Sequence, residues 1–111
     1  MNAYEIPNLR FSLPAGGAVA RHRFVSVDAD SNGIQATAAT QVIGASMNQA
    51  KAGEVLEIAN GIVMVEAGAT VTAGSVAYAD ANGKVTTTGT VVAGVVVTSA
   101  VAGGLAAIKI N

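Results

Sequence analysis

The sequence contains no cysteine and no tryptophan, and only 4% of its residues are aromatic. Without cysteine, neither a disulfide framework nor a thiolate metal site can form. Charged residues make up 12% of the chain and the net charge is −1, where globular proteins usually carry about twice that charged share. A chain with so few cations has no basic face to hold phosphates, so we expect no nucleic-acid partner.

Catalytic side chains are equally scarce. His22 is the only histidine, and it lies between Arg21 and Arg23. One histidine without a second histidine or a carboxylate cluster supplies neither a supported general base nor a transition-metal site. The serines lie in no nucleophile-elbow context. We therefore expect a protein that is not an enzyme and uses no cofactor.

Residues 28–33 (DADSNG) match the opening of a calcium-binding loop. Such a loop needs oxygen ligands at its first, third and fifth positions, glycine at the sixth and a bidentate carboxylate at the twelfth. The twelfth position is Ala39, whose side chain has no oxygen. The same residue types form ordinary polar turns, so we expect a turn here and no bound metal.

Alanine is the commonest residue, but it lies among valine, threonine and 13 glycines, which favours short strands and frequent turns over helices. Residues 71–85 (VTAGSVAYADANGKV) predict a β-hairpin, because β-branched and aromatic residues flank an Asn-Gly pair. Asn and Gly tolerate the positive φ of the primed turns that match strand twist. The predicted hairpin turns are Asn82-Gly83 and, earlier in the chain, Asn32-Gly33.

The two halves of the chain resemble each other, which predicts an internal duplication. The offset is 52 residues before the hairpin turn and 50 after it, as in Val19 with Val71, Asp28 with Asp80, Gly33 with Gly83, and Gly44 with Gly94. We place the change of offset inside the turn, where an insertion is tolerated best. The predicted repeats are residues 15–58 and 67–110 of a single β domain, 15–111, which follows an extended N-terminal arm, residues 1–14.

Turns recur at intervals of fewer than ten residues, as in a small sandwich or barrel. Two units that each have one apolar face can bury those faces against each other. We expect Asn60-Gly61 to form a turn and residues 62–66 to form a strand that joins the units. The predicted fold class is all-β, a small sandwich or barrel built from two duplicated units that each contain a β-hairpin.

Residues 91–108 carry no charge and are long enough to cross a bilayer. Their counterpart in the first repeat, residues 41–58, contains a lysine and two glutamates, which a membrane span would not tolerate. Because duplicated units should share a fold, both segments are predicted to be strands, and we expect no membrane partner.

The first residues of the chain contain Pro7 and Pro14, which block a helix, and no apolar core of signal-peptide length. We therefore expect synthesis in the cytoplasm and an extended segment. It can be an edge strand on its own domain or an arm on a neighbouring subunit, and both interpretations stay open. Aromatic and arginine side chains are enriched where interface energy concentrates. Five residues are therefore candidate contacts with another chain: Tyr4, Ile6, Leu9, Arg10 and Phe11.

A set of strand and turn residues in the second unit carries a family resemblance: Val71, Ala73, Gly74, Val76, Tyr78, Asp80, Gly83, Lys84, Val85, residues 86–88, Val92, Gly94, Val95 and residues 100–110. The first unit shares fewer: Pro14, Ala15, Gly16, Gly17 and Val19. Through these residues the chain resembles the small capsid cement, or decoration, proteins of tailed bacteriophages. Charged residues 21–23 replace the small residues of that pattern, so the turn there is expected to differ.

This resemblance implies a structural virion protein that binds the outside of an assembled phage head and stabilises it. It also implies a homotrimer near local threefold axes, with the major capsid protein as partner. The five candidate contacts would then touch the capsid or a neighbouring cement subunit. The protein would be made in the host cytoplasm and would end on the capsid exterior.

Two other functions remain open. Biotinyl- and lipoyl-carrier domains also consist of two pseudo-symmetric β halves and present a lysine at a hairpin tip, where Lys84 follows Asn82-Gly83. The acidic and apolar context for attachment is missing around Lys84. A phage tail or adhesion module would bind a cell or a tail protein and would leave heads untouched.

Overall fold

The computed structural model describes residues 6–111, which form nine strands and, within that range, no helix. The strands are β1 (Ile6–Pro14), β2 (Phe24–Val27), β3 (Gly33–Gln35), β4 (Gly44–Ser46), β5 (Val55–Glu66), β6 (Val76–Ala79), β7 (Val85–Thr86), β8 (Val92–Val96) and β9 (Leu105–Ile110). The prediction of an all-β fold is confirmed. The uncharged residues 91–108 contain β8 and most of β9, in agreement with the strands predicted for them from the charged counterpart in the first repeat.

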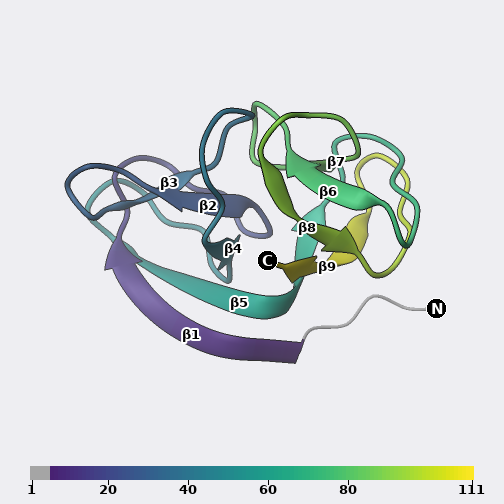
Figure 1. Ribbon diagram of the computed structural model, residues 1–111. Helices are drawn as coiled ribbons and strands as arrows, with labels where there is room; N and C mark the ends of the chain where they lie inside the picture. The colour runs from purple at the N-terminus through teal and green to yellow at the C-terminus, as the bar shows by residue number, and fades with distance from the viewer. Residues whose placement is uncertain (1–5) are drawn as a thin grey trace.

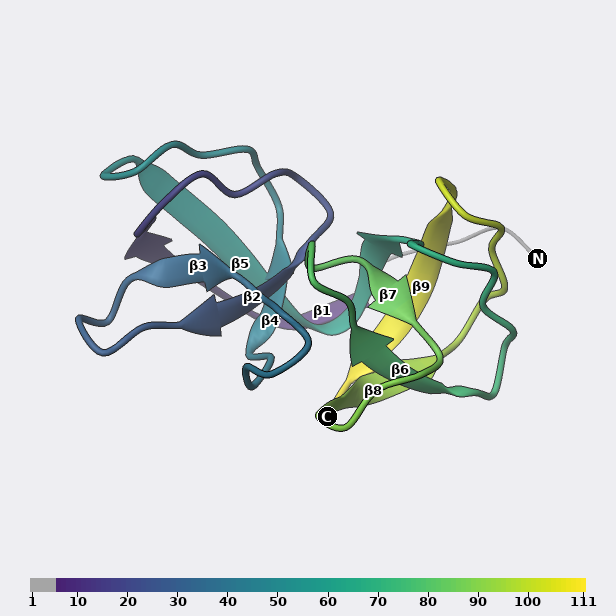
Figure 2. The same cartoon turned by 90° about the horizontal axis from the view of Figure 1, so that it is seen from above.

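All nine strands belong to one sheet with the order β3-β2-β4-β5-β9-β8-β6-β7, and β1 pairs with β5. The sheet curls into two lobes that lie side by side and share β5 (Figures 1 and 2). We call residues 6–60 the first lobe and residues 61–111 the second lobe. Every strand pair is antiparallel.

Strand β5 joins the lobes, because its first half pairs with β1 and β4 and its second half with β9. The turn predicted at Asn60-Gly61 is wrong, since the strand continues through both residues. Gly61 has a φ of 115°, and Asn60 Nδ2 donates a hydrogen bond to the Ile43 carbonyl oxygen over 3.0 Å. The residues on both sides of the pair lie opposite β1 and not opposite each other, so the Asn-Gly pair does not close a hairpin.

The pairing of β1 with β5 recurs in the pairing of β5 with β9. Arg10 lies opposite Ala59 and Leu13 opposite Leu56, while Ile62 lies opposite Lys109 and Val65 opposite Ala106. The first members of these pairs differ by 52 residues and the second by 50. Strand β1 is therefore the counterpart of residues 62–66, and the segment predicted as an arm outside the repeats is the first strand of the first lobe.

Three residues with positive φ in the first lobe have a counterpart at the same position in the second lobe. The pairs are His22 and Gly74 (φ 61° and 89°), Ser31 and Gly83 (64° and 73°), and Gly53 and Gly103 (83° and 87°). Loop hydrogen bonds recur too: the Val19 amide donates to the Ala50 carbonyl, and the Val71 amide donates to the Ala100 carbonyl, both over 2.9 Å. This recurrence supports the predicted duplication.

The two hairpin turns have the same length, which corrects the alignment within the turn. Asp28 Oδ1 accepts the amides of residues 30 and 32, and Asp80 Oδ1 accepts those of residues 82 and 84. Gly33 already belongs to β3, so the reversal at the predicted Asn32-Gly33 turn lies earlier, with Ser31 in the left-handed conformation. In the second turn Gly83 has positive φ and Asn82 does not, so Asn82-Gly83 does not form a type I′ turn, which needs positive φ at both central residues, nor a type II′ turn, which needs it at the first.

The change of offset from 52 to 50 falls in the next loop. Ser26 lies opposite Ile34 and Tyr78 opposite Thr86, so the offset is still 52 in β3 and β7. Phe24 lies opposite Ala45 and Val76 opposite Val95, so it is 50 in β4 and β8. The two extra residues of the first lobe therefore lie between β3 and β4.

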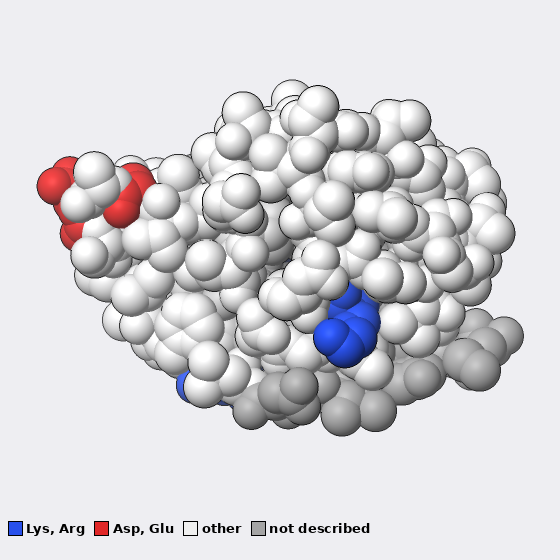
Figure 3. Space-filling view, viewed as in Figure 1, with Lys and Arg blue, Asp and Glu red and all other residues white. Residues whose placement is uncertain are grey.

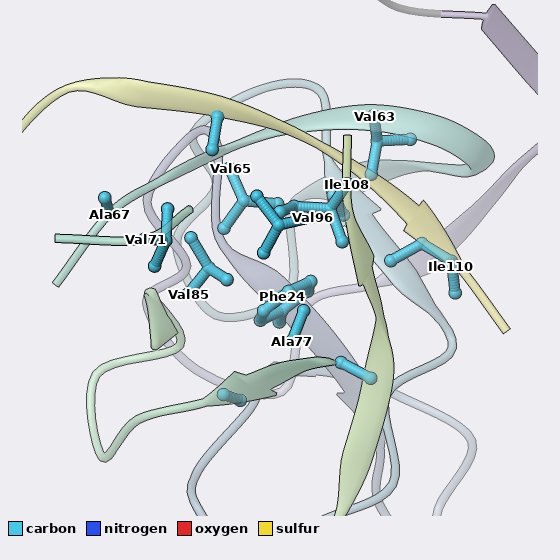
Figure 4. Close-up of a cluster of buried hydrophobic side chains, with 14 of the residues drawn as sticks. Phe24, Val63, Val65, Ala67, Val71, Ala77, Val85, Val96, Ile108 and Ile110 are labelled. Carbon is cyan, nitrogen blue, oxygen red and sulfur yellow. The ribbon is translucent and has the colours of Figure 1, made fainter. Parts of the chain in front are cut away.

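Two apolar clusters form the core. The smaller lies in the first lobe and consists of Ala15, Val19, Val25, Ala50, Leu56 and Ile58. The larger lies in the second lobe, yet Phe24 of β2 is wholly buried in it, beside Ala77, Val85 and Val96 (Figure 4). One face of the first lobe is thus packed into the core of the second.

Candidate interaction surface

Strand β1 holds most of the contact residues that the sequence singled out. Tyr4 lies outside the described residues, and the backbone of Ile6 pairs with Ile62. Leu9 is 57% exposed, and Arg10 Nη2 lies 3.3 Å from Glu57 Oε2 in an exposed ion pair of a kind that contributes little to stability. Phe11 is half-buried against the smaller cluster. Leu9 and Arg10 therefore face outward, while Phe11 packs on its own lobe.

A second exposed apolar surface was missed in the sequence. Val76 lies opposite Val95, and Val95 opposite Lys109, so the three side chains share one face of the sheet. Val76, Val92 and Val95 are 44%, 44% and 41% exposed, and we call these three residues the valine face. Val92 lies opposite Tyr78, beyond a register shift in the β6–β8 pairing, which brings it to the same face as Val95. The valine-rich run of β8 was the available signal, because a strand with one buried face leaves the valines of its other face outside.

The surface around β6 and β8 carries few charges. Figure 3, drawn in the orientation of Figure 1, shows white side chains over these strands, acidic side chains at the far end of the first lobe, a basic patch near the end of β9, and a smaller, partly hidden basic area at the lower edge of the first lobe. Contact with another protein through such a surface would desolvate few charges, which keeps the cost of burial low.

A shallow hollow of about 340 Å³ lies in the first lobe between Ala18, Val19, Ala20, Gln35, Gln49, Ala50 and Lys51. Gln35 Oε1 accepts a hydrogen bond from the Ala20 amide over 3.2 Å, so it already serves the loop. Lys51 is the single ionisable residue of the lining. The hollow offers no pair of acid and base groups for catalysis.

Charged groups of both lobes meet at Glu66, at the end of β5. Its two carboxylate oxygens lie 3.4 Å from Arg23 Nη1 and 3.0 Å from Lys84 Nζ. The Lys84 hydrogen bond lowers the pKa of Glu66, burial opposes this, and the Arg23 charge lowers the pKa further. The Glu66 amide also donates to the His22 carbonyl over 2.9 Å. This cluster ties the two lobes together.

Acidification is expected to weaken this joint. Because the pKa of Glu66 in the folded protein is below its usual 4.5, its stabilising contribution is complete above pH 4.5 and is lost as the pH falls through the folded pKa. We expect Glu66→Gln to have a lower melting temperature at neutral pH and a smaller further loss on acidification than the wild type. Glu57→Gln, at the exposed pair, is the control and should follow the wild type; equal pH profiles for all three proteins would contradict this role of Glu66.

In the acidic turn of the first lobe, the Asp28 carboxylate is hydrogen-bonded to residues of the same turn. Asp28 Oδ1 accepts two backbone amides and Oδ2 accepts Asn32 Nδ2 over 3.4 Å, and the bond from the Asn32 amide is the main cause that lowers the pKa of Asp28. Among residues 6–111, no three histidine or acidic side chains gather where they could hold a metal ion. In the same part of the chain, no helix has the length and apolarity to cross a membrane.

Comparison with known proteins adds two findings. A family model described as phage cement protein matches residues 4–110. The solved structure of the head fiber gp8.5 N base in bacteriophage phi29 is similar, with a TM-score of 0.76 and 19% sequence identity over 93% of each chain. At this identity the likeness shows a shared fold. No curated protein matches the chain significantly.

Proposed function

Because the chain belongs to the phage cement protein family, we propose that it binds the outer surface of an assembled phage head and stabilises the shell. The family match over residues 4–110 carries this proposal. The partner would be the major capsid protein, and the protein would be made in the host cytoplasm and reside on the capsid exterior. By the family resemblance it would act as a homotrimer.

The physical properties of the chain suit such a role. The two lobes share one sheet and are joined by the Glu66 ion pairs, which makes a rigid body. A cement protein needs only a rigid body with a surface that bridges several shell subunits. Each weak contact of a bridging protein then acts at high effective concentration, so many copies together stabilise a shell.

The proposed contact set is Tyr4, Ile6, Leu9, Arg10 and Phe11, and of these Leu9 and Arg10 are seen to be exposed on β1. Leu9→Ser and Arg10→Ala are each expected to weaken binding to expanded heads by roughly tenfold, the loss typical of a substantial interface residue. Co-sedimentation with purified heads measures this, and compact precursor heads should bind less wild-type protein.

The matched control is Val101→Ser, which changes an exposed apolar side chain (69%) in the second lobe. All three variants should melt like the wild type, because none alters a buried residue. If the β1 variants bind heads as the wild type does, β1 is not the capsid contact. If the wild type fails to bind any head, the cement function itself is wrong.

The carrier-domain alternative finds less support in the geometry. Lys84 Nζ is engaged with Glu66 Oε2 at 3.0 Å, and the turn tip contacts the first lobe, since the Gly83 carbonyl accepts the Phe24 amide over 2.7 Å. A lysine for attachment must be free to reach a modifying enzyme. Intact mass separates the alternatives, because a biotinyl or lipoyl group on Lys84 would exclude the cement function. A tail or adhesion module would not co-sediment with heads.

A further inference from the structure

The same sheet positions are covered in the first lobe and open in the second. Phe24, Ala45 and Ala59 are 0%, 1% and 0% exposed, and Val42 packs against the larger cluster. Their counterparts in the second lobe, by the registers given above, are Val76, Val95, Lys109 and Val92. These four residues are all exposed. The valine face is therefore the second copy of a surface that is buried in the first lobe.

The second lobe is what covers this surface in the first lobe. Phe24 is buried in the larger cluster, to which Val63, Val65 and Val85 also belong, and Figure 4 shows it beside Ala77, Val85 and Val96. Its amide donates to the Gly83 carbonyl over 2.7 Å. The covering surface therefore includes the tip of the β6–β7 hairpin, and the second half of β5 contributes Val63 and Val65 to the same cluster.

The covering surface also has a counterpart, and this counterpart lies in the first lobe. Phe11 and Leu13 of β1 correspond to Val63 and Val65, and Ser31 corresponds to Gly83. Phe11 and Leu13 are only half-buried and Ser31 is exposed. Each of the two surfaces that meet in the contact between the lobes therefore has an exposed counterpart. The counterpart of one surface is the valine face of the second lobe, and the counterpart of the other is formed by Phe11, Leu13 and Ser31 of the first lobe.

We propose that the valine face of one copy docks on the Phe11, Leu13 and Ser31 surface of a second copy, head to tail, in the way that the lobes dock inside one chain. This inference rests on the self-association part of the proposed function and identifies the surfaces that perform it. A contact between two different surfaces generates a ring when its rotation closes. Three copies of a two-lobed chain would then form a ring of six similar lobes.

The contact between copies differs from the internal one in its charges. The Glu66, Arg23 and Lys84 cluster is replaced at the corresponding positions by Pro14, Ser75 and Asn32, none of which is charged. Pro14 also has no amide to repeat the bond that Glu66 donates to His22. Apolar burial therefore drives this contact, and added salt should not dissociate it. Lys109 can lay its methylene stem on the apolar surface and keep its ammonium group in water.

Engineered cysteines test the geometry, because the chain has none of its own. Phe24 and Gly83 are hydrogen-bonded neighbours, so their counterparts Val76 and Ser31 should meet between copies at a separation that a disulfide can bridge. Under mild oxidation, a mixture of Val76→Cys protein and Ser31→Cys protein should give a cross-linked dimer. Neither variant alone should cross-link, and the double variant should form closed covalent rings.

The control pairs Ser31→Cys with Val101→Cys. Val101 corresponds to Lys51, which stays exposed in the first lobe, so it lies outside the proposed contact and should not cross-link. As a second measurement, Val95→Asp should raise the dissociation constant of self-association by roughly a hundredfold, because it buries an unpaired charge. Val101→Asp should leave that constant unchanged.

Cross-linking is measured both in solution and on heads, which separates this inference from the cement function. Cross-linking of the Val76→Cys protein alone would mean a two-fold contact and would overturn the proposal. A mixture that cross-links no better than the control in both settings would also overturn it, even if the protein binds heads. The expected cross-link in a protein that binds no head would sustain the head-to-tail contact and exclude the cement function.

Discussion

Gly83→Val is expected to lower the free energy of unfolding by about 2–5 kcal/mol, since it combines backbone strain with overpacking. Gly83 has a φ of +73°, and a Cβ atom there would lie 2.8 Å from Gln35 Cγ, 3.2 Å from the Phe24 oxygen and 3.3 Å from the Ala36 oxygen. All three atoms belong to the first lobe, so the variant should also loosen the lobe contact. Urea denaturation followed by circular dichroism measures the loss.

Gly103→Val is the matched control. Gly103 has a φ of +87°, but no atom lies within 4 Å of its Cβ position. The substitution therefore carries the backbone strain of about 1–2 kcal/mol without the packing term. The difference between the two losses in the free energy of unfolding measures how tightly the hairpin tip packs against the first lobe. Equal losses would show that the tip does not bear on it.

The strands of the second lobe were largely predictable because local signals agree there. Valines and Tyr78 flank a glycine whose left-handed backbone does lie in the turn. In the first lobe the matching position is Ser31, and His22 likewise takes the place of Gly74. Positive φ is not predicted for serine or histidine from the sequence. The alignment therefore matched Gly33 with Gly83 by identity and placed the two extra residues of the first lobe in the wrong loop.

The lobe contact could not be predicted from local pattern at all. Phe24 and Val76 are both apolar strand residues at equivalent positions, yet one is wholly buried and the other is 44% exposed. The difference arises from which lobe has a neighbour on that side, which is a property of the assembled chain. Sequence reasoning therefore identified the outward Leu9 and Arg10 on β1 but missed the valine face.

The N-terminal segment shows the same limit, because alternation predicts a strand but not the strand that it pairs with. Leu9, Phe11 and Leu13 suit either an edge strand on the same domain or an arm on another subunit. In the structure β1 pairs with β5 from Ile6 to Pro14, and Phe11 and Leu13 pack against Leu56 and Ile58. Residues 6–14 are therefore an edge strand of their own domain.

Deletion of residues 2–13 is therefore expected to unfold the protein, although the sequence predicted that they form an arm that precedes the β domain. The deletion removes two large side chains from the smaller cluster, at about 2–5 kcal/mol each for losses of this kind, and leaves one edge of β5 unpaired. Such a loss is comparable with the whole stability of a small domain, about 5–15 kcal/mol. Thermal denaturation should show no cooperative transition in the truncated protein.

Leu9→Ser and Arg10→Ala separate this structural role from surface effects. Both change outward side chains of the same strand, so each should stay within about 0.5 kcal/mol of the wild type, as surface substitutions usually do. A truncated protein that melts cooperatively within a few degrees of the wild type would contradict the expected loss. In that case the first lobe would close without β1, and the strand would be free to serve as an arm on a neighbouring subunit.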